Sequence, residues 1–328
     1  MNTDNVAVSV LMTAFNHEKY IAMAIDSVLA QQVDFRYEIL IGDDASTDKT
    51  PYIIREYAER YPDIIRFVKR SKNIGATRNS YELNLMCRGD YIAPLEADDY
   101  WIDNQKLQKQ KDFLDAHPEH LGCSAGIVYI SKDGAILPHY KLDWYTPKEC
   151  FSIKDYDGFH LPGQTSAYMR RNIFRTPKFD YSIMYSVHPQ IGDRICAAVY
   201  LLHGDICFLS EKMTAYRIPL GRKDAGTNLV YSNRLNSMCV DIALYKAEKE
   251  LLLKHGKTLK GDYAARRIFY STLVSYFKTG DVLFKNTAKQ ILKETDNALR
   301  TYILFIPHLF SRIINIIANK YYQKSYKS

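Results

Sequence analysis

Two adjacent carboxylates, Asp98 and Asp99, follow an apolar run at residues 91–95 that is typical of a β-strand. Adjacent carboxylates repel each other, and burying them unpaired is costly. Divalent cations such as Mg²⁺ or Mn²⁺ remove this cost, because they bind carboxylate oxygens and often share them with a substrate's phosphates. One interpretation is therefore a metal–diphosphate site. The other is a solvated turn or a helix N-cap, in which an Asp-Asp pair is equally ordinary.

Composition places the chain among ordinary globular proteins. Its 328 residues are 47% hydrophobic and 25% charged, which argues against disorder. The net charge of +7 is too small to imply nucleic acid binding, and we expect none. Six cysteines show neither a CxxC motif nor zinc-site spacing, and no signal peptide is recognised, so we predict reduced cytosolic thiols that lie mostly in the core. These are Cys87, Cys123, Cys150, Cys196, Cys207 and Cys239.

Strands and helices alternate ahead of the acidic pair. Uncharged or mainly apolar runs predict strands at 6–12, 37–41 and 64–68, and apolar residues at helical spacing predict helices between them. This order predicts a parallel sheet with right-handed crossovers. Asn16 is the expected N-cap of the first helix, which we place at 18–32.

Polar residues follow three of the predicted strands, at 13–16, at Asp43-Asp44 and at Asp98-Asp99. In open α/β sheets, ligands bind beyond the carboxyl ends of the strands, so one shared pocket is the simplest explanation. This placement favours the metal interpretation of the acidic pair. Neither GxGxxG nor GxxxxGK[ST] follows the first strand, so a diphosphate here would need the metal and basic side chains.

Further elements are expected downstream of the acidic pair. They are a helix at 105–117, a strand at 122–131, a hairpin turn at 132–134, a strand at 163–171, a helix from 191 to about 203, and short strands at 206–209 and 214–218. Residues 139–160 are aromatic and irregular. Asp193 lies at the start of its helix, where an N-cap is the ordinary interpretation of a lone aspartate.

Several segments together resemble the family 2 glycosyltransferases with the GT-A fold, of the bacterial surface-polysaccharide type. The resemblance covers roughly residues 6–220, and the joint pattern is more specific than any one segment. The segments are 9–21, 27–32, 41–48, 73–75, 89–92, 96–99, 192–193 and, more weakly, 216–217.

The resemblance implies roles for residues around a nucleotide-sugar donor. Thr13 and Phe15 match residues that line the nucleotide base. Asp44, with Asp43 beside it, matches the acidic position that hydrogen-bonds the uracil ring. Arg78 resembles a basic position near the donor. These matches imply a UDP-sugar as the expected donor.

The resemblance also implies the reacting groups. Asp99 would bind Mn²⁺ or Mg²⁺, Asp98 would contact the ribose or sugar side of the donor, and Asp193 matches the catalytic base of inverting members. Many members carry a histidine after the Tyr-Arg segment, whereas this chain continues Ile-Pro-Leu-Gly-Arg-Lys at 218–223. Arg217 and Arg222 are therefore the candidate diphosphate contacts, with Lys223 as the other cation of that loop or a plain solvated residue.

The expected architecture is a GT-A (Rossmann-like) mixed, mainly parallel sheet flanked by helices over residues 1–225, followed by a C-terminal helical region over 226–328. Helices are expected at about 231–255, 262–279 and 282–299. The apolar, aromatic and basic segment 301–328 is a poor bilayer span but suits the surface of an anionic membrane. The alternatives are a helix packed on the catalytic domain or a homodimer interface.

The expected function is metal-assisted, inverting transfer of a sugar from a nucleotide-sugar donor to a hydroxyl of a glycan or lipid-linked glycan, in cell-surface polysaccharide synthesis. The expected location is the cytoplasm, with peripheral contact to the inner face of the membrane. One alternative is a sugar-nucleotide pyrophosphorylase, which should carry a Gly-rich, basic loop after the first strand. The other is a non-catalytic scaffold that binds nucleotide sugars.

Overall fold

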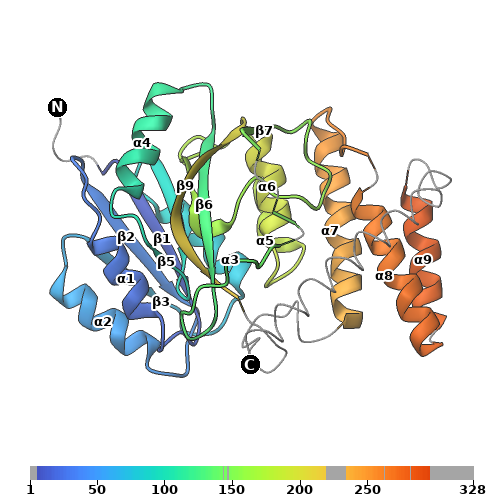
Figure 1. Ribbon diagram of the computed structural model, residues 1–328, viewed down its shortest axis with the longest axis horizontal. Helices are drawn as coiled ribbons and strands as arrows, with labels where there is room; N and C mark the ends of the chain where they lie inside the picture. The colour runs from blue at the N-terminus through green and yellow to red at the C-terminus, as the bar shows by residue number, and fades with distance from the viewer. Residues whose placement is uncertain are drawn as a thin grey trace. The chain divides into compact units, whose positions relative to one another are not determined.

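The computed structural model describes residues 6–142, 144–145, 148–218, 234–261, 263–280 and 282–295 (Figure 1). The chain divides into two compact units. The first unit comprises residues 1–138, 147–152 and 162–218, and the second unit comprises residues 139–146, 153–161 and 219–328.

The described part of the first unit contains a nine-stranded mixed sheet (Figure 1). Its order is β3-β2-β1-β4-β8-β6-β9-β5, with β7 paired to β9. The pairs β1–β2, β1–β4, β2–β3 and β6–β9 are parallel, and the other four pairs are antiparallel. The predicted α/β class is confirmed, with a parallel sheet in its first four strands. The strands are β1 (Val8–Ala14), β2 (Tyr37–Asp43), β3 (Ile65–Lys69), β4 (Tyr91–Glu96), β5 (Tyr100–Trp101), β6 (Gly122–Ile130), β7 (Cys150–Phe151), β8 (Tyr168–Arg171) and β9 (Ile206–Arg217).

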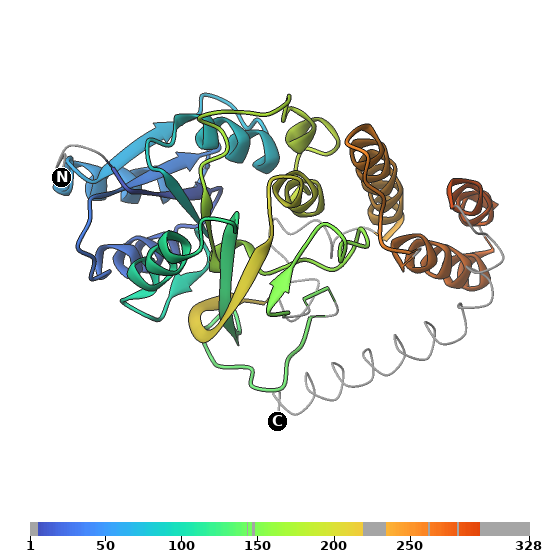
Figure 2. The same cartoon turned by 90° about the horizontal axis from the view of Figure 1, so that it is seen from above.

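Helices cover both faces of this sheet (Figure 2). They are α1 (Ile21–Leu29), α2 (Thr50–Arg60), α3 (Ala76–Met86), α4 (Lys106–Ala116), α5 (Ile183–Ser186) and α6 (Asp193–Leu201). Alternate β1 side chains, such as Val10 and Met12, share one buried cluster with Ile25 of α1, Ile54 of α2 and Leu107 of α4. Full burial of an aliphatic side chain stabilises the fold by roughly 1.5–3 kcal/mol, so this cluster holds one helical layer on the sheet.

The opposite face packs against α3 and α6. A Cβ atom at Gly42 of β2 would lie 2.5 Å from Leu83 Cδ1 of α3, so the Leu83 side chain packs directly over this glycine. Arg170 of β8 donates to Asn84 of α3, and its guanidinium lies 4.3 Å from the ring centre of Tyr200 of α6. The sheet therefore lies between two helical layers, with its carboxyl-end loops left at the edge.

Asn16 does not cap the first helix, contrary to the sequence prediction. The helix begins later, at Ile21, and Asn16 adopts a left-handed backbone conformation with φ of 58°. Its Oδ1 atom accepts a hydrogen bond from the backbone N of Thr47 at 2.9 Å, which ties the loop after β1 to the loop after β2. Asparagine tolerates this conformation better than most residues, so it serves here as a loop connector.

Two predicted strand boundaries are also wrong. The short strands expected at 206–209 and 214–218 are one strand, β9, whose register with β6 shifts around Gly126. The strand expected at 163–171 starts as a 3₁₀ turn, η1 (Thr165–Ala167), and only then becomes β8. Ser210, Glu211 and Lys212 interrupt the apolar pattern of β9, and these exposed residues lie where its register with β6 shifts.

The prediction of reduced thiols is wrong for one pair of cysteines. Cys150 and Cys207 form a disulfide between β7 and β9, across 57 residues of sequence. No local spacing could have indicated this pair, because only the antiparallel pairing of two strands places the residues opposite each other. Among the described cysteines, Cys87 and Cys123 are free and buried, as expected for core thiols.

The described part of the second unit is mainly helical, with α7 (Arg234–Lys254), α8 (Tyr263–Thr279) and α9 (Val282–Glu294) close to their predicted positions. Its apolar core joins Phe159, Ile242, Phe269 and Ile291. No described helix is long and apolar enough to cross a membrane. The segment 301–328 lies outside the described residues, so its membrane contact stays a prediction.

Candidate active site

Three loops meet at the carboxyl edge of the sheet. The parallel ladder pairs Ala14 with Asp43 and Thr13 with Glu96, so β1, β2 and β4 end at the same level. The backbone N of Asp44 donates to Ala14 O at 2.9 Å, which continues this alignment into the loops. The predicted gathering of residues 13–16, Asp43-Asp44 and Asp98-Asp99 at one edge is therefore confirmed.

An acidic cluster consists of Glu96, Asp98 and Asp99, which each offer a carboxylate oxygen within 4.8 Å of the others. Asp99 is buried and strongly anchored. Its Oδ2 atom accepts hydrogen bonds from Ser166 Oγ at 2.6 Å and Gln164 Nε2 at 3.1 Å, and its Oδ1 atom accepts from the backbone N of Arg217 at 2.8 Å. These bonds orient one carboxylate of the cluster before any ligand arrives.

Burial and mutual repulsion perturb the acidic cluster. The pKa of Glu96 is raised well above its usual range, first by burial and then by the negative charges of Asp99, Asp98 and Asp193. The pKa of Asp99 is also raised well above its usual range, first by burial and then by Asp98, although its hydrogen bonds partly offset this. A divalent cation would relieve this repulsion, and carboxylate oxygens are the ligands that Mg²⁺ and Mn²⁺ prefer. The donor set therefore fits such a cation.

Asp193 is the first residue of α6 and follows Gly192. Its side chain is accessible to solvent, yet the protein around it limits hydration, and this desolvation raises its pKa. The negative charge of Asp193 raises the pKa values of both Glu96 and Tyr216, so Asp193 acts electrostatically on one member of the acidic cluster. An accessible carboxylate with a raised pKa has the properties of a general base.

Arg217 holds the acidic loop in place. Its guanidinium donates to three backbone carbonyls, those of Asp98 at 2.8 Å, Ser131 at 3.0 Å and Lys132 at 2.7 Å, and it lies 4.3 Å from the ring centre of Tyr20. These contacts make Arg217 a positioning residue rather than a cation that points toward solvent. Arg222 and Lys223, the other predicted cations, lie outside the described residues.

The two acids after β2 have different environments. Both carboxylate oxygens of Asp44 hold the next loop, because Oδ1 accepts from Ile74 N at 2.8 Å and Oδ2 accepts from Gly75 N at 3.0 Å. Asp43 accepts from Ser46 N at 3.2 Å through Oδ2, whereas its buried Oδ1 atom has no partner among the described residues. Burial raises the pKa of Asp43. Asp44 thus positions the next loop, and Asp43 retains an unused acceptor.

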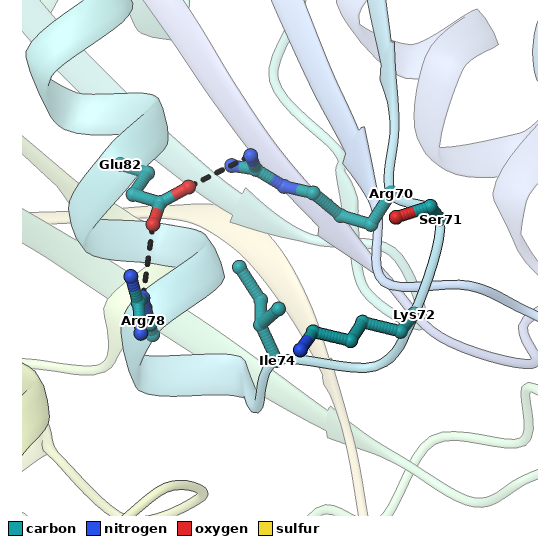
Figure 3. Close-up of a pocket in the computed structure, with 6 residues that line it drawn as sticks. All are labelled: Arg70, Ser71, Lys72, Ile74, Arg78 and Glu82. Atoms are coloured by element: carbon teal, nitrogen blue, oxygen red, sulfur yellow. Dashed lines mark hydrogen bonds and ion pairs between the residues drawn. The ribbon is translucent and has the colours of Figure 1, made fainter.

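Arg78 lies at a small pocket of about 260 Å³ beside the loop that Asp44 holds (Figure 3). Glu82 joins the two arginines of this pocket, at 2.7 Å from Arg70 and 3.0 Å from Arg78. The remaining lining residues are Ser71, Lys72 and Ile74. Thr13, at the end of β1, and Phe15, in the following loop, are half-buried at the adjacent edge of the sheet.

Glu96 and Gln164 were not predicted as site residues, and the contacts of Ser166 and Arg217 with Asp99 were not predicted either. Glu96 had a local signal, since it lies two residues before Asp98, but it was not assigned a role. Gln164 and Arg217 reach Asp99 from 65 and 118 residues away in sequence, and Ser166 from 67. Such contacts depend on where β8 and β9 lie in the sheet, and no sequence pattern specifies that order.

Comparisons with known proteins converge on one family. The family model described as Glycosyl transferase family 2 matches residues 9–176. An uncharacterized protein of Mycobacterium tuberculosis is 36% identical over 219 residues, which are 64% of this chain and 58% of that protein. An uncharacterized glycosyltransferase of Methanocaldococcus jannaschii is 31% identical over 219 residues, covering 66% of this chain and 72% of that protein.

A likeness in fold extends further along the chain. The structure of TarS residues 1–349 of S. aureus, in complex with UDP-GlcNAc, superposes with a TM-score of 0.63 and covers 98% of this chain and 92% of that one. Its sequence identity is 15%, so this likeness concerns the fold alone.

Proposed function

Because the chain belongs to glycosyl transferase family 2, we propose that it transfers a sugar from a UDP-sugar to a hydroxyl group, with inversion of the anomeric configuration. The hydroxyl would belong to a glycan or lipid-linked glycan in cell-surface polysaccharide synthesis. One observation carries the proposal: Asp193, a solvent-accessible carboxylate with a raised pKa, acts electrostatically on Glu96, which shares an acidic cluster with Asp98 and Asp99. This arrangement offers a base and a metal site at one edge of a nucleotide-binding type of sheet.

The acidic cluster would hold Mn²⁺ or Mg²⁺ through Asp99, with Asp98 and Glu96 as the other available carboxylates. The cation supplies positive charge to the diphosphate as that group leaves. Asp99 is kept in place by Ser166, Gln164 and the backbone of Arg217. The Arg217 guanidinium fixes the carbonyl of Asp98, so the loop that carries both aspartates needs little rearrangement on binding.

The donor's base would bind beside β1 and β2. Asp43 is favoured over Asp44 for accepting an N–H group of the base, because Asp43 Oδ1 has no partner among the described residues whereas both oxygens of Asp44 hold the 74–75 loop. Thr13 and Phe15 would line the base from the end of β1, and Arg78 would provide positive charge near the phosphates.

Asp193 would remove the proton from the acceptor hydroxyl while that oxygen attacks the anomeric carbon. Its raised pKa strengthens it as a base, since a carboxylate of higher proton affinity accepts a proton more readily. Attack from the face opposite the departing diphosphate makes this a single displacement, which inverts the anomeric configuration. No second carboxylate nucleophile is required.

Two alternatives have less support. A sugar-nucleotide pyrophosphorylase would need a Gly-rich basic loop after β1, whereas residues 13–17 read Thr-Ala-Phe-Asn-His. A non-catalytic scaffold would not need an accessible carboxylate with a raised pKa at Asp193.

We propose that the enzyme lies on the cytoplasmic face of the membrane and contacts it through segment 301–328. Deletion of that segment should abolish binding to anionic liposomes.

The Asp193→Asn variant tests the catalytic proposal, because asparagine keeps the shape of the side chain but is no base. UDP release from a panel of UDP-sugars, with Mn²⁺ and with water as acceptor, should fall by about 10²–10⁴-fold, the usual contribution of a general base. Donor binding, measured by calorimetry, should remain close to wild type. Asp133→Asn, at the exposed hairpin turn, is the matched control and should keep full activity. Undiminished UDP release by Asp193→Asn would show that another group is the base.

A further inference from the structure

A second cluster of metal-ligating side chains lies in the first unit, apart from the acidic cluster. A ring nitrogen of His120 and the sulfur atoms of Cys150 and Cys207 all lie within 4.8 Å of one another. Cys207 is at the start of β9 and Arg217 is at its end, so about 30 Å of strand separates this cluster from the acidic loop at the usual rise per residue. The glycosyltransferase mechanism proposed above uses none of these three side chains.

Three separate elements bring the cluster together. Cys207 of β9 pairs with Cys123 of β6 on one side and with Cys150 of β7 on the other. The turn between α4 and β6 carries His120, and the bond from Leu121 N to Asp205 O at 2.9 Å keeps this turn beside the start of β9. Arg171 of β8 also donates to the carbonyl of His120 at 3.0 Å. The backbone around the cluster is therefore rigidly supported.

The imidazole of His120 is oriented by its neighbours. Its ring stacks on Phe113, with ring centres 6.1 Å apart and planes 5° apart. Glu119 Oε1 lies 3.4 Å from His120 Nε2 and 3.3 Å from His117 Nδ1. A carboxylate close to the imidazole is a common feature of metal-ligating histidines. The side chain of His120 is 19% exposed, so ions from solvent can reach it.

We propose that the reduced form of this cluster binds Zn²⁺ through the thiolates of Cys150 and Cys207 and a ring nitrogen of His120, with water as the fourth ligand. Two sulfurs and one imidazole, with one open position, form a tetrahedral donor set that suits zinc. A plain disulfide needs neither an imidazole within reach of its sulfurs nor a carboxylate beside that imidazole. The disulfide of the structure is then the oxidised, metal-free form of the same site.

The two forms exchange by a balanced reaction. A dithiol reductant transfers two electrons and two protons to the Cys150–Cys207 bond and is itself oxidised to a disulfide. The two cysteine thiols then release two protons as they bind Zn²⁺, while His120 binds as the neutral imidazole. A reducing compartment such as the cytosol keeps thiols reduced, which favours the zinc form. Either form links β7 to β9.

The test uses the full-length protein, with zinc chloride and cobalt chloride as probes. After reduction by a phosphine and removal of excess metal, the wild type should retain close to one zinc per chain by mass spectrometry. The oxidised protein and the Cys150→Ser/Cys207→Ser variant should retain none at this site. Cobalt should give a sulfur-to-metal charge-transfer band and the intense visible bands of tetrahedral coordination, neither of which a carboxylate site produces.

Two further variants separate the ligands from other binding groups. His120→Gln should weaken metal binding by at least about tenfold, the lower end of the effect of losing even an outer-shell partner. Cys239→Ser, which removes an exposed free thiol, is the matched control and should bind zinc normally. In the reduced wild type, zinc should also slow alkylation of the Cys150 and Cys207 thiols, and this readout requires no variant. Absence of the cobalt–thiolate band in the reduced wild type, or equal zinc retention by the double serine variant, would overturn the proposal.

Discussion

Replacement of Lys106 by methionine should stabilise the protein at pH 6, and this gain should shrink as the pH rises. Lys106 is fully buried, and its Nζ atom donates to Gln110 Oε1 at 2.6 Å and to Tyr168 O at 3.3 Å. The ammonium also lies 4.3 Å from the ring centre of Trp101, and no carboxylate forms an ion pair with it among the described residues. Burial lowers the pKa of Lys106 from 10.5 to about 7.

The magnitude follows from this depressed pKa. Between pH 7 and pH 10.5, the unfolded chain binds a proton at Lys106 that the folded protein does not, so this group makes the free energy of unfolding rise with pH. At about 1.36 kcal/mol per pKa unit, the charge costs the folded state up to about 5 kcal/mol below pH 7. Methionine has a similar length and no charge, but it leaves Gln110 short of a donor, which costs about 1–3 kcal/mol. We therefore expect a net gain of about 3 kcal/mol at pH 6.

Urea unfolding of wild type and Lys106→Met at pH 6, 8 and 9.5 would measure this difference. Comparing the two proteins at each pH cancels the titration of other groups. Lys109→Met is the matched control: Lys109 is on the same helix but is partly exposed and paired with Asp103 at 2.7 Å. It should show no pH-dependent gain over this range. If Lys106→Met were less stable than wild type by the same amount at every pH, the ammonium would be well solvated by its partners and the reasoning would be refuted.

Three other outcomes follow from the site and its loops. Asp99→Ala should lose the Mn²⁺-dependent rise in melting temperature with UDP-sugars, because it removes the anchored carboxylate; an unchanged rise would exclude Asp99 as a ligand. Mn²⁺ affinity in calorimetry should fall as the pH is lowered through the raised pKa values of Glu96 and Asp99, since protons compete for the same oxygens; a flat profile from pH 8 to pH 5.5 would contradict this. Gly75→Ala should destabilise the protein by more than the roughly 1–3 kcal/mol expected for backbone strain alone, because φ is +92° and the new Cβ would lie 2.5 Å from Pro189 O. Gly134→Ala, with φ of +88° and no atom within 4 Å, isolates the strain, and equal losses in denaturant unfolding would exclude the clash.

The position of the edge that carries the acidic cluster could be predicted from the sequence because its cause is local. Apolar runs such as 6–12 and 37–41 must be buried on both faces, and strands that alternate with helices pair in parallel. Parallel pairing brings the ends of β1, β2 and β4 to one level, so Thr13, Asp43 and Asp98 had to gather there whatever the rest of the chain did. The family resemblance rests on these same local segments.

The roles of individual site residues required the tertiary structure. Asp43 and Asp44 are adjacent and chemically identical, yet only Asp44 meets the backbone N–H groups of the 74–75 loop, and Asp43 Oδ1 has no hydrogen-bond partner in the described part of the chain. Arg217 is predicted from the sequence as a diphosphate contact, and only the antiparallel pairing of β9 with β5 reveals that it also lies against the loop of Asp98. Side-chain direction at a loop decides such roles, and residue type alone does not determine that direction.

By itself, the sequence of this protein determined the α/β class, the shared edge of the first parallel strands and the acids that lie on that edge. These features could be predicted because hydrophobic periodicity and strand–helix order act over short stretches of chain. Only the tertiary structure decided which groups anchor Asp99, which of two neighbouring aspartates keeps an unused oxygen, and that Cys150 meets Cys207 beside His120. Those contacts join segments 30 to 118 residues apart. The contacts of Asp99 and of the cysteine pair depend on the order and register of β6 to β9, which is set by the packing of the whole sheet and has no local signature.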